Sequence, residues 1–210
     1  MPERRSRRVW PFVAGLLLVV LGAGVWVAYA LTLGDARRGA AAASGLVDEW
    51  LAGCGRTQPT VLEEGTIVAA LSFPGRSEVR WPVRYGITEA SLDGGIGWYP
   101  DTEAPGEPGN MVVAGYRLSH GAPFWDVLKL DAGDRVVLET CSAVYTYLVD
   151  IPPRELTVSV TEGGWIFADV PGVESLVPTR ALLTLTTSQD LLPGDLRAVG
   201  FAVLAEVRIR

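Results

Sequence analysis

An uncharged, strongly apolar run from Val9 to Gly34 is the first pattern along the chain. A helix rises 1.5 Å per residue, so this run is longer than the hydrocarbon core of a bilayer, which is about 30 Å thick. The pattern therefore predicts a transmembrane helix over residues 9–34. Four arginines in residues 1–8 precede it, against two partly neutralised arginines in residues 35–38. This imbalance predicts a cytoplasmic N-terminus and places the rest of the chain outside the cell membrane.

A cleaved secretory signal is the alternative interpretation, because the Ala-Tyr-Ala at residues 28–30 resembles a small-residue cleavage site. The apolar region of a secretory signal, however, is only about 7 to 15 residues long. We therefore expect an uncleaved single-pass anchor. Residues 35–51 are Ala-rich with charges at both ends, which predicts a juxtamembrane helix. Residues 53–65 lack helical periodicity and are expected to link this helix, as one segment over residues 35–65, to the folded domain.

Short β-rich segments separated by Gly, Pro and Asp turns fill residues 66–210. Their regular spacing, without long intervening helices, favours an antiparallel barrel or sandwich over a parallel α/β sheet. Short helical turns are expected near residues 88–92 and 125–128. The sequence thus predicts an all-β domain. Its eight predicted strands cover residues 66–73, 79–83, 111–115, 134–140, 143–149, 155–160, 181–187 and 199–207.

Charge and cysteine content narrow the classes of function. A formal net charge of −6 argues against a nucleic-acid partner, which requires clustered Lys and Arg. With only Cys54, Cys141 and a single histidine, the chain has no ligand set for zinc and no Cys-x-x-Cys redox motif. Outside the cytoplasm the two thiols are able to pair, but two unrelated buried cysteines are an equally open alternative.

The acidic residues between positions 93 and 107 lie in a Gly- and Pro-rich segment. We interpret this segment as a solvated loop and not as a calcium site, because the acidic residues lack the spacing of an EF-hand. No metal and no cofactor is therefore expected.

Two stretches of the chain carry a motif order that points to a family. The first has a strand ending in Ala-Gly-x-Arg at residues 114–117, then His-Gly-Ala-Pro-Phe at 120–124, then a Gly-Asp turn into a strand. The second has Leu-Thr-Leu-Thr-Thr at residues 183–187. From about Thr66 to Arg210 the chain resembles the class E sortases of Gram-positive actinobacteria. This resemblance implies an eight-stranded β-barrel with short helices, carried on a membrane anchor.

Sortases use a Cys, a His and an Arg to cut a sorting signal and transfer its acyl group to an amine. The resemblance places Ser188 at the Cys position, Tyr116 at the His position and Arg197 at the Arg position. A thiol, with a pKa of about 8.5, ionises beside His and Arg, whereas an alcohol needs a strong general base. A tyrosine phenol, with an ordinary pKa of about 10, stays neutral near pH 7. The resemblance therefore implies a catalytically impaired sortase, or pseudoenzyme, in which Arg197 still binds a substrate carbonyl.

Three hypotheses for function follow. The leading one is a membrane-anchored domain outside the cell that recognises sorting-signal peptides or a cell-wall or pilin-type protein, or pairs with an active sortase. The second is an active transpeptidase or hydrolase using Ser188 with His120 or with a polarised Tyr116 as its base. His120 otherwise lies in the loop after Tyr116 as a rim or solvent-facing residue. The third is an envelope element whose groove is closed by aromatic side chains. An open groove, and the distance of His120 from Ser188, discriminate among them.

Overall fold

The computed structural model describes residues 10–55, 61–172, 178–190 and 194–210. The predicted basic tail over residues 1–8 and part of the predicted linker, residues 56–60, lie outside this range. The elements are α1 (Trp10–Ala52), β1 (Ile67–Ser72), β2 (Trp81–Tyr85), α2 (Glu89–Leu92), β3 (Ile96–Trp98), β4 (Gly109–Gly115), the 3-10 helix η2 (Val127–Lys129), β5 (Arg135–Glu139), β6 (Ala143–Ile151), β7 (Thr157–Ser159), the 3-10 helix η3 (Gly163–Phe167), β8 (Ala181–Ser188) and β9 (Leu196–Ile209).

Eight of the strands form a closed β-barrel. Their order is β6-β5-β1-β2-β3-β4-β8-β9, and β9 pairs back onto β6 to close the ring. The predicted all-β, eight-stranded barrel is confirmed, although one of its members differs from the sequence expectation. The predicted strand over residues 155–160 becomes β7, which pairs with β9 outside the ring, and its place is taken by β3.

Most of the strand pairings are antiparallel, as the sequence favours, but two of them are parallel. β2 pairs in parallel with β3, and β4 pairs in parallel with β8. The chain between β4 and β8 includes the β5–β6 hairpin and η3, which gives it the length that a parallel connection requires. Side chains that point inward along the strands form the barrel core, in which Phe73, Phe124 and Tyr147 are among the largest fully buried residues.

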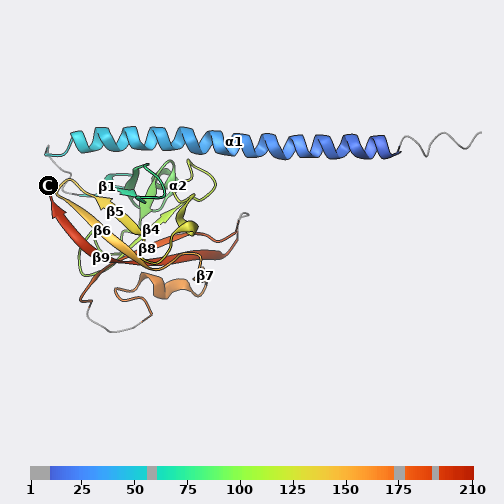
Figure 1. The fold of residues 1–210 in the computed structure, drawn as a ribbon. Helices are drawn as coiled ribbons and strands as arrows, with labels where there is room; N and C mark the ends of the chain where they lie inside the picture. The colour runs from blue at the N-terminus through green and yellow to red at the C-terminus, as the bar shows by residue number, and fades with distance from the viewer. Residues whose placement is uncertain (1–9, 56–60, 173–177, 191–193) are drawn as a thin grey trace, which may run out of the picture.

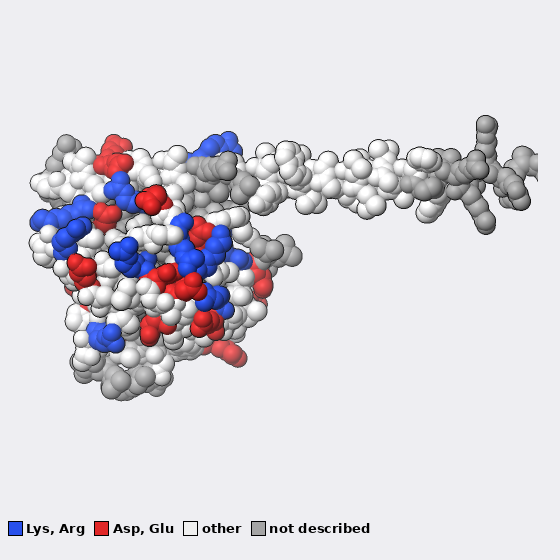
Figure 2. All heavy atoms as spheres, in the orientation of Figure 1, with Lys and Arg blue, Asp and Glu red and all other residues white. Residues whose placement is uncertain are grey.

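The N-terminal helix α1 is continuous where the sequence predicts an anchor followed by a separate juxtamembrane helix. Its first half includes the stretch Phe12–Leu31, which is fully exposed and is long and apolar enough to cross a membrane. This part extends away from the barrel in Figure 1 and shows no charged side chain in the view of Figure 2. The second half lies against the barrel, where Ala43 and Val47 are buried and Arg80 forms an ion pair with Asp48.

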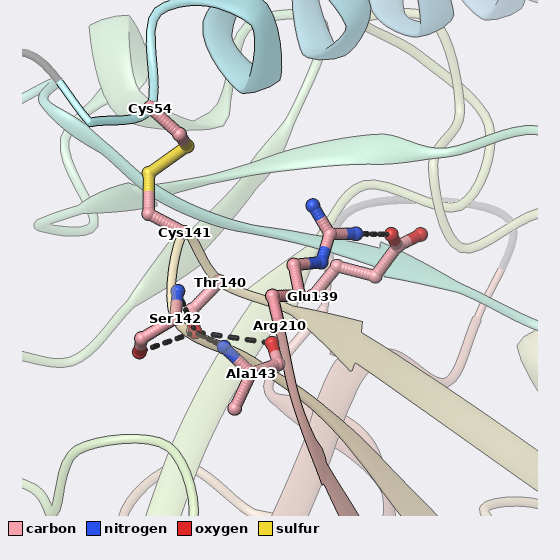
Figure 3. Close-up of a disulfide and its surroundings, with 7 residues drawn as sticks. All are labelled: Cys54, Glu139, Thr140, Cys141, Ser142, Ala143 and Arg210. Atoms are coloured by element: carbon pink, nitrogen blue, oxygen red, sulfur yellow. Dashed lines mark hydrogen bonds and ion pairs between the residues drawn. A yellow bond between two sulfur atoms is a disulfide. The ribbon is translucent and has the colours of Figure 1, made fainter.

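A disulfide between Cys54 and Cys141 joins the end of α1 to the β5–β6 hairpin (Figure 3). The sequence did not decide between a disulfide and two unrelated cysteines, and the structure shows the disulfide. The C-terminal end of β9 lies at the same hairpin, because the Arg210 amide donates a 2.9 Å hydrogen bond to the carbonyl oxygen of Ser142. The disulfide therefore lies at the opposite end of β9 from Arg197, separated by roughly 40 Å of strand at about 3.3 Å per residue.

Replacing both cysteines by serine should lower the free energy of unfolding of the barrel by about 2–5 kcal/mol, because the disulfide closes a long loop in the unfolded chain. Urea denaturation of the full chain in detergent, followed by tryptophan fluorescence, measures this difference. Alkylation in denaturant provides the control. Before reduction the wild type should take up no alkyl groups, and uptake there would contradict the pairing.

Candidate functional site

A groove with a volume of about 600 Å³ lies where β4 and β8 end and β9 begins. Its walls come from the loop after β4, the segment from β7 to η3, and the ends of β8 and β9. It is open, which argues against the hypothesis of a closed groove. The lining residues are Ile87, Leu92, Tyr99, Ala114, Gly115, Tyr116, Arg117, Leu118, Ser119, Val158, Ser159, Val160, Gly163, Ile166, Phe167, Thr186, Thr187, Ser188, Asp190, Gly194 and Arg197.

Strand register brings three of the predicted site residues into this groove. In the parallel pair of β4 and β8, Ala114 lies opposite Thr186, so the two strands end together, with Tyr116 just beyond β4 and Ser188 the last residue of β8. In the antiparallel pair of β8 and β9, Ser188 lies directly opposite Arg197. Residues separated by about 70 positions in sequence therefore line one groove.

A buried hydrogen bond holds the ends of β4 and β8 together. The hydroxyl of Thr187, which is buried, donates to the carbonyl oxygen of Gly115 at 2.7 Å. Two residues further along each segment, the Arg117 guanidinium donates a 2.8 Å hydrogen bond to the carbonyl oxygen of Gln189. These two bonds tie the residues on either side of Tyr116 to the residues on either side of Ser188.

Arg197 is held in place by the backbone of the β8–β9 connection. Its guanidinium donates hydrogen bonds to the carbonyl oxygens of Gly194 at 2.7 Å and Leu196 at 3.2 Å. The same positive charge acts on the phenol of Tyr99. Burial raises the pKa of Tyr99, and the charge of Arg197 opposes that rise. The guanidinium of Arg197 and the phenol of Tyr99 therefore interact electrostatically within the groove.

Tyr99 is a groove residue that the sequence analysis did not identify. It follows β3 directly, and its ring packs edge-on against Phe167 with 4.8 Å between the ring centroids. Phe167 ends η3, which forms another wall of the groove. The missing signal was strand β3 itself, because a segment of three residues with Gly97 at its centre does not display a strand pattern.

A buried polar network fixes η3 against the barrel. The side-chain amide of Asn110 donates to the carbonyl oxygens of Ile166 at 2.8 Å and Ala168 at 3.1 Å. The oxygen of the same amide accepts a 2.6 Å hydrogen bond from the Thr184 hydroxyl. Because Asn110 and Thr184 are fully buried, these bonds form in a medium that strengthens them, and they set the position of the η3 wall.

The structure does not bring His120 to Ser188. The imidazole stacks on the ring of Tyr116, with 4.2 Å between the centroids and 18° between the planes. Its Nδ1 lies 3.0 Å from the hydroxyl of Ser119. Among the described residues, the Ser188 hydroxyl has one hydrogen-bond partner, the carbonyl oxygen of Asp190, at 3.4 Å. Within the described ranges no side-chain base forms a hydrogen bond with Ser188, and the half-buried His120 is stacked on Tyr116.

Comparison with known proteins assigns the family. The family model described as "Sortase domain" matches residues 71–205, which is more than half of the chain. The chain belongs to the sortase family. Among curated proteins it is similar to sortase SrtE1 of Streptomyces coelicolor, with 30% identity over 181 residues, covering 80% of this chain and 48% of that protein. It is also similar to sortase SrtE2 of the same organism, with 31% identity over 150 residues, covering 64% of this chain and 59% of that protein.

Solved structures agree with this assignment. Sortase E from Streptomyces avermitilis has a TM-score of 0.60 and 30% identity, covering 70% of this chain and 93% of that one. Sortase E1 from Streptomyces coelicolor with a tripeptide in the active site has a TM-score of 0.60 and 26% identity, covering 70% and 92%. The predicted resemblance to class E sortases is therefore confirmed. The chain spans about half the length of the curated relatives that it matches.

Replacing Thr187 by valine should lower the free energy of unfolding by about 1–3 kcal/mol, because it leaves the buried carbonyl of Gly115 without its partner. Chemical denaturation of both proteins measures the loss. Thr157→Val, at an exposed position on β7, is the matched control and should be nearly neutral. Equal losses in the two variants would contradict the structural role of the Thr187 hydroxyl.

Replacing Arg197 by methionine should raise the pKa of Tyr99, since the variant loses the positive charge that stabilises the phenolate. Carbon NMR of ring-labelled tyrosine, assigned with Tyr99→Phe, follows the titration. Arg208→Met, also on β9 but at its far end, should leave this pKa unchanged. An unchanged pKa of Tyr99 in the Arg197 variant would show that the charge does not act on this phenol, and a fall would contradict the prediction as well.

Proposed function

We propose that this sortase-family protein binds sorting-signal peptides in its groove and does not cut them by cysteine chemistry. One observation supports this most directly. The groove has Arg197 opposite Ser188, whereas both cysteines of the chain are joined in the disulfide at the other end of β9. A sortase groove without a thiol retains the means to bind a peptide but lacks the nucleophile.

Ser188 is a poor replacement for a cysteine in this setting. An alcohol attacks a peptide carbonyl only when a neighbouring base takes its proton. We take Tyr116 and Ser188 as the positions that correspond to the family's catalytic His and Cys. A phenol is a weaker general base than an imidazole, so Tyr116 does not serve as that base, and the imidazole of His120 is stacked on the Tyr116 ring. Acyl transfer through Ser188 is accordingly not expected.

The chemistry of the groove suits an extended peptide. Its walls include the apolar side chains of Val158, Ile166 and Phe167, which accept apolar side chains of a ligand. Both hydrogen bonds of the Arg197 guanidinium come from one nitrogen, and among the described residues its other N–H groups have no hydrogen-bond partner, so we propose that they donate to a peptide carbonyl oxygen. A tripeptide occupies the active site in the similar sortase E1 from Streptomyces coelicolor, which supports the same use here.

We further propose that Phe12–Leu31 anchors the chain in the cell membrane with the barrel on the outside. The disulfide supports this location, because disulfides persist in oxidising compartments and are rare in the cytosol. In this location the ligands are the sorting signals of cell-wall or pilin-type proteins, and an active sortase is the partner that processes a bound signal.

The test compares the wild type with the double substitution Tyr116→His, Ser188→Cys, using a panel of fluorescein-labelled sorting-signal peptides and scrambled controls. We expect both proteins to bind a peptide, measured by fluorescence polarisation, and only the double variant to cleave it or transfer it to an amine. Arg197→Met should weaken binding roughly tenfold or more, the equivalent of losing a hydrogen bond to a charged group.

Two outcomes would contradict the proposal. Turnover by the wild type that disappears in Ser188→Ala would make the protein a serine enzyme of the sortase type. Failure of the wild type to bind any peptide of the panel more tightly than its scrambled control would remove the binding function.

A further inference from the structure

The helix α1 touches the loop that forms one wall of the groove. Gly39 of α1 faces Gly121 so closely that a Cβ added to Gly39 would lie 2.4 Å from the Cα of Gly121. Non-bonded carbon atoms normally approach to only about 3.5 Å, so the two backbones are in direct contact, and glycine at position 39 is what permits it. We call residues 116–124 the helix-contact loop.

The helix-contact loop links this contact to the groove over a short distance. Tyr116, at the start of the loop, lines the groove, and its carbonyl oxygen accepts a 3.0 Å hydrogen bond from the amide of Phe124 at the end. The phenyl ring of Phe124 is fully buried in the barrel core. The two ends of the loop are thus fixed to each other and to the core, and Gly121 lies between them.

The turn at the centre of this loop has an unusual backbone. His120, Gly121 and Ala122 have φ angles of 53°, 80° and 56°, all in the left-handed region. Two of these residues carry a Cβ, for which this conformation is costly, so surrounding contacts must hold it. One is the hydrogen bond from the Gly94 amide to the carbonyl oxygen of His120, at 3.1 Å. Another is the close approach of Gly39 of α1 to Gly121.

On the C-terminal side of the Gly39–Gly121 contact, the helix is fixed to the barrel by several further interactions. Ala43 and Val47 are buried one and two turns further along α1, and the Ser44 hydroxyl accepts a 3.4 Å hydrogen bond from the Arg80 amide. The Asp48–Arg80 ion pair and the disulfide at Cys54 follow. The barrel-facing side of α1 is therefore a rigid support against which the turn at residues 120–122 is held.

We propose that α1 positions the Tyr116 wall of the groove through the Gly39–Gly121 contact, so that peptide affinity depends on the N-terminal helix. Gly39 and Gly121 are positioning residues, because they act on the groove through Tyr116 and do not line it directly. Moving the turn outward shifts the ring of His120 and, through the stacked pair, the ring of Tyr116. The effect on affinity rests on the proposed function, whereas the effect on the loop does not.

The chain offers a matched pair of variants for the test. Gly39→Ala and Gly45→Ala add the same methyl group to the same helix. In each case the intrinsic preference of alanine for a helix favours the helical state by about 1 kcal/mol. The Cβ at position 45 meets nothing within 4 Å, whereas the Cβ at position 39 must displace the backbone of Gly121. Any difference between the variants therefore reports the contact and not the helix.

The experiment uses the full chain, free of any tag, in phospholipid nanodiscs. His120 is the single histidine of the sequence, so the Cε1–H group of its imidazole gives one NMR signal that reports the turn without any ligand. We expect Gly39→Ala to shift this signal and to weaken binding of the tightest peptide of the panel by about fivefold or more, the scale of coupling between linked sites. Gly45→Ala should change neither. Circular dichroism and the mass of the intact disulfide establish that both variants are folded.

The two measurements separate the possible failures. An unchanged His120 signal in Gly39→Ala, or a shifted signal with unchanged affinity in a protein that binds peptide, would overturn the positioning role. Equal effects in both glycine variants would overturn it as well. A shifted signal in Gly39→Ala, together with a wild type that binds no peptide, would support the contact and contradict the proposed function alone.

Discussion

The parallel pairing of β4 with β8 is the constraint on which the site depends. Parallel strands end at the same edge of a sheet, so the pairing delivers Tyr116 and Ser188 to one groove. Because side chains alternate along a strand, a slip of one residue would turn every inward side chain outward, and burial of the core fixes the register. The hydrogen bond from Thr187 to the Gly115 carbonyl secures the pairing at its last position.

The placement of the groove residues is independent of the chemical group that residue 188 carries. Arg197 is held by backbone carbonyls of its own connection, and Ser188 is placed by its pairing with Arg197. Neither arrangement depends on whether position 188 carries a thiol or a hydroxyl. The position of Arg197 and the pairing of the strands at the groove therefore do not depend on the chemical group at position 188. The disulfide acts elsewhere, since it joins α1 to the β5–β6 hairpin.

Local patterns in the sequence predicted most of the fold, and non-local geometry accounts for what they missed. Alternating apolar residues marked eight strands, and the motif order marked the groove residues. Strand β3 was missed because it has only three residues, and Tyr99 was missed with it. The disulfide was left open because its cysteines lie 87 residues apart and meet only when α1 packs on the barrel. The position of His120 depends on a left-handed turn that no sequence period encodes.

The helix α1 joins the apolar stretch Phe12–Leu31 to the half that packs on the barrel without a break. Between Leu31, where the membrane-crossing stretch ends, and Gly39, where the barrel contact begins, eight residues of helix span about 12 Å. With the first stretch in a bilayer, as proposed, the barrel is held close to the membrane surface and lacks the freedom that a flexible linker would give it. A ligand must then present its binding segment at that height, which favours peptides that are themselves attached to the membrane.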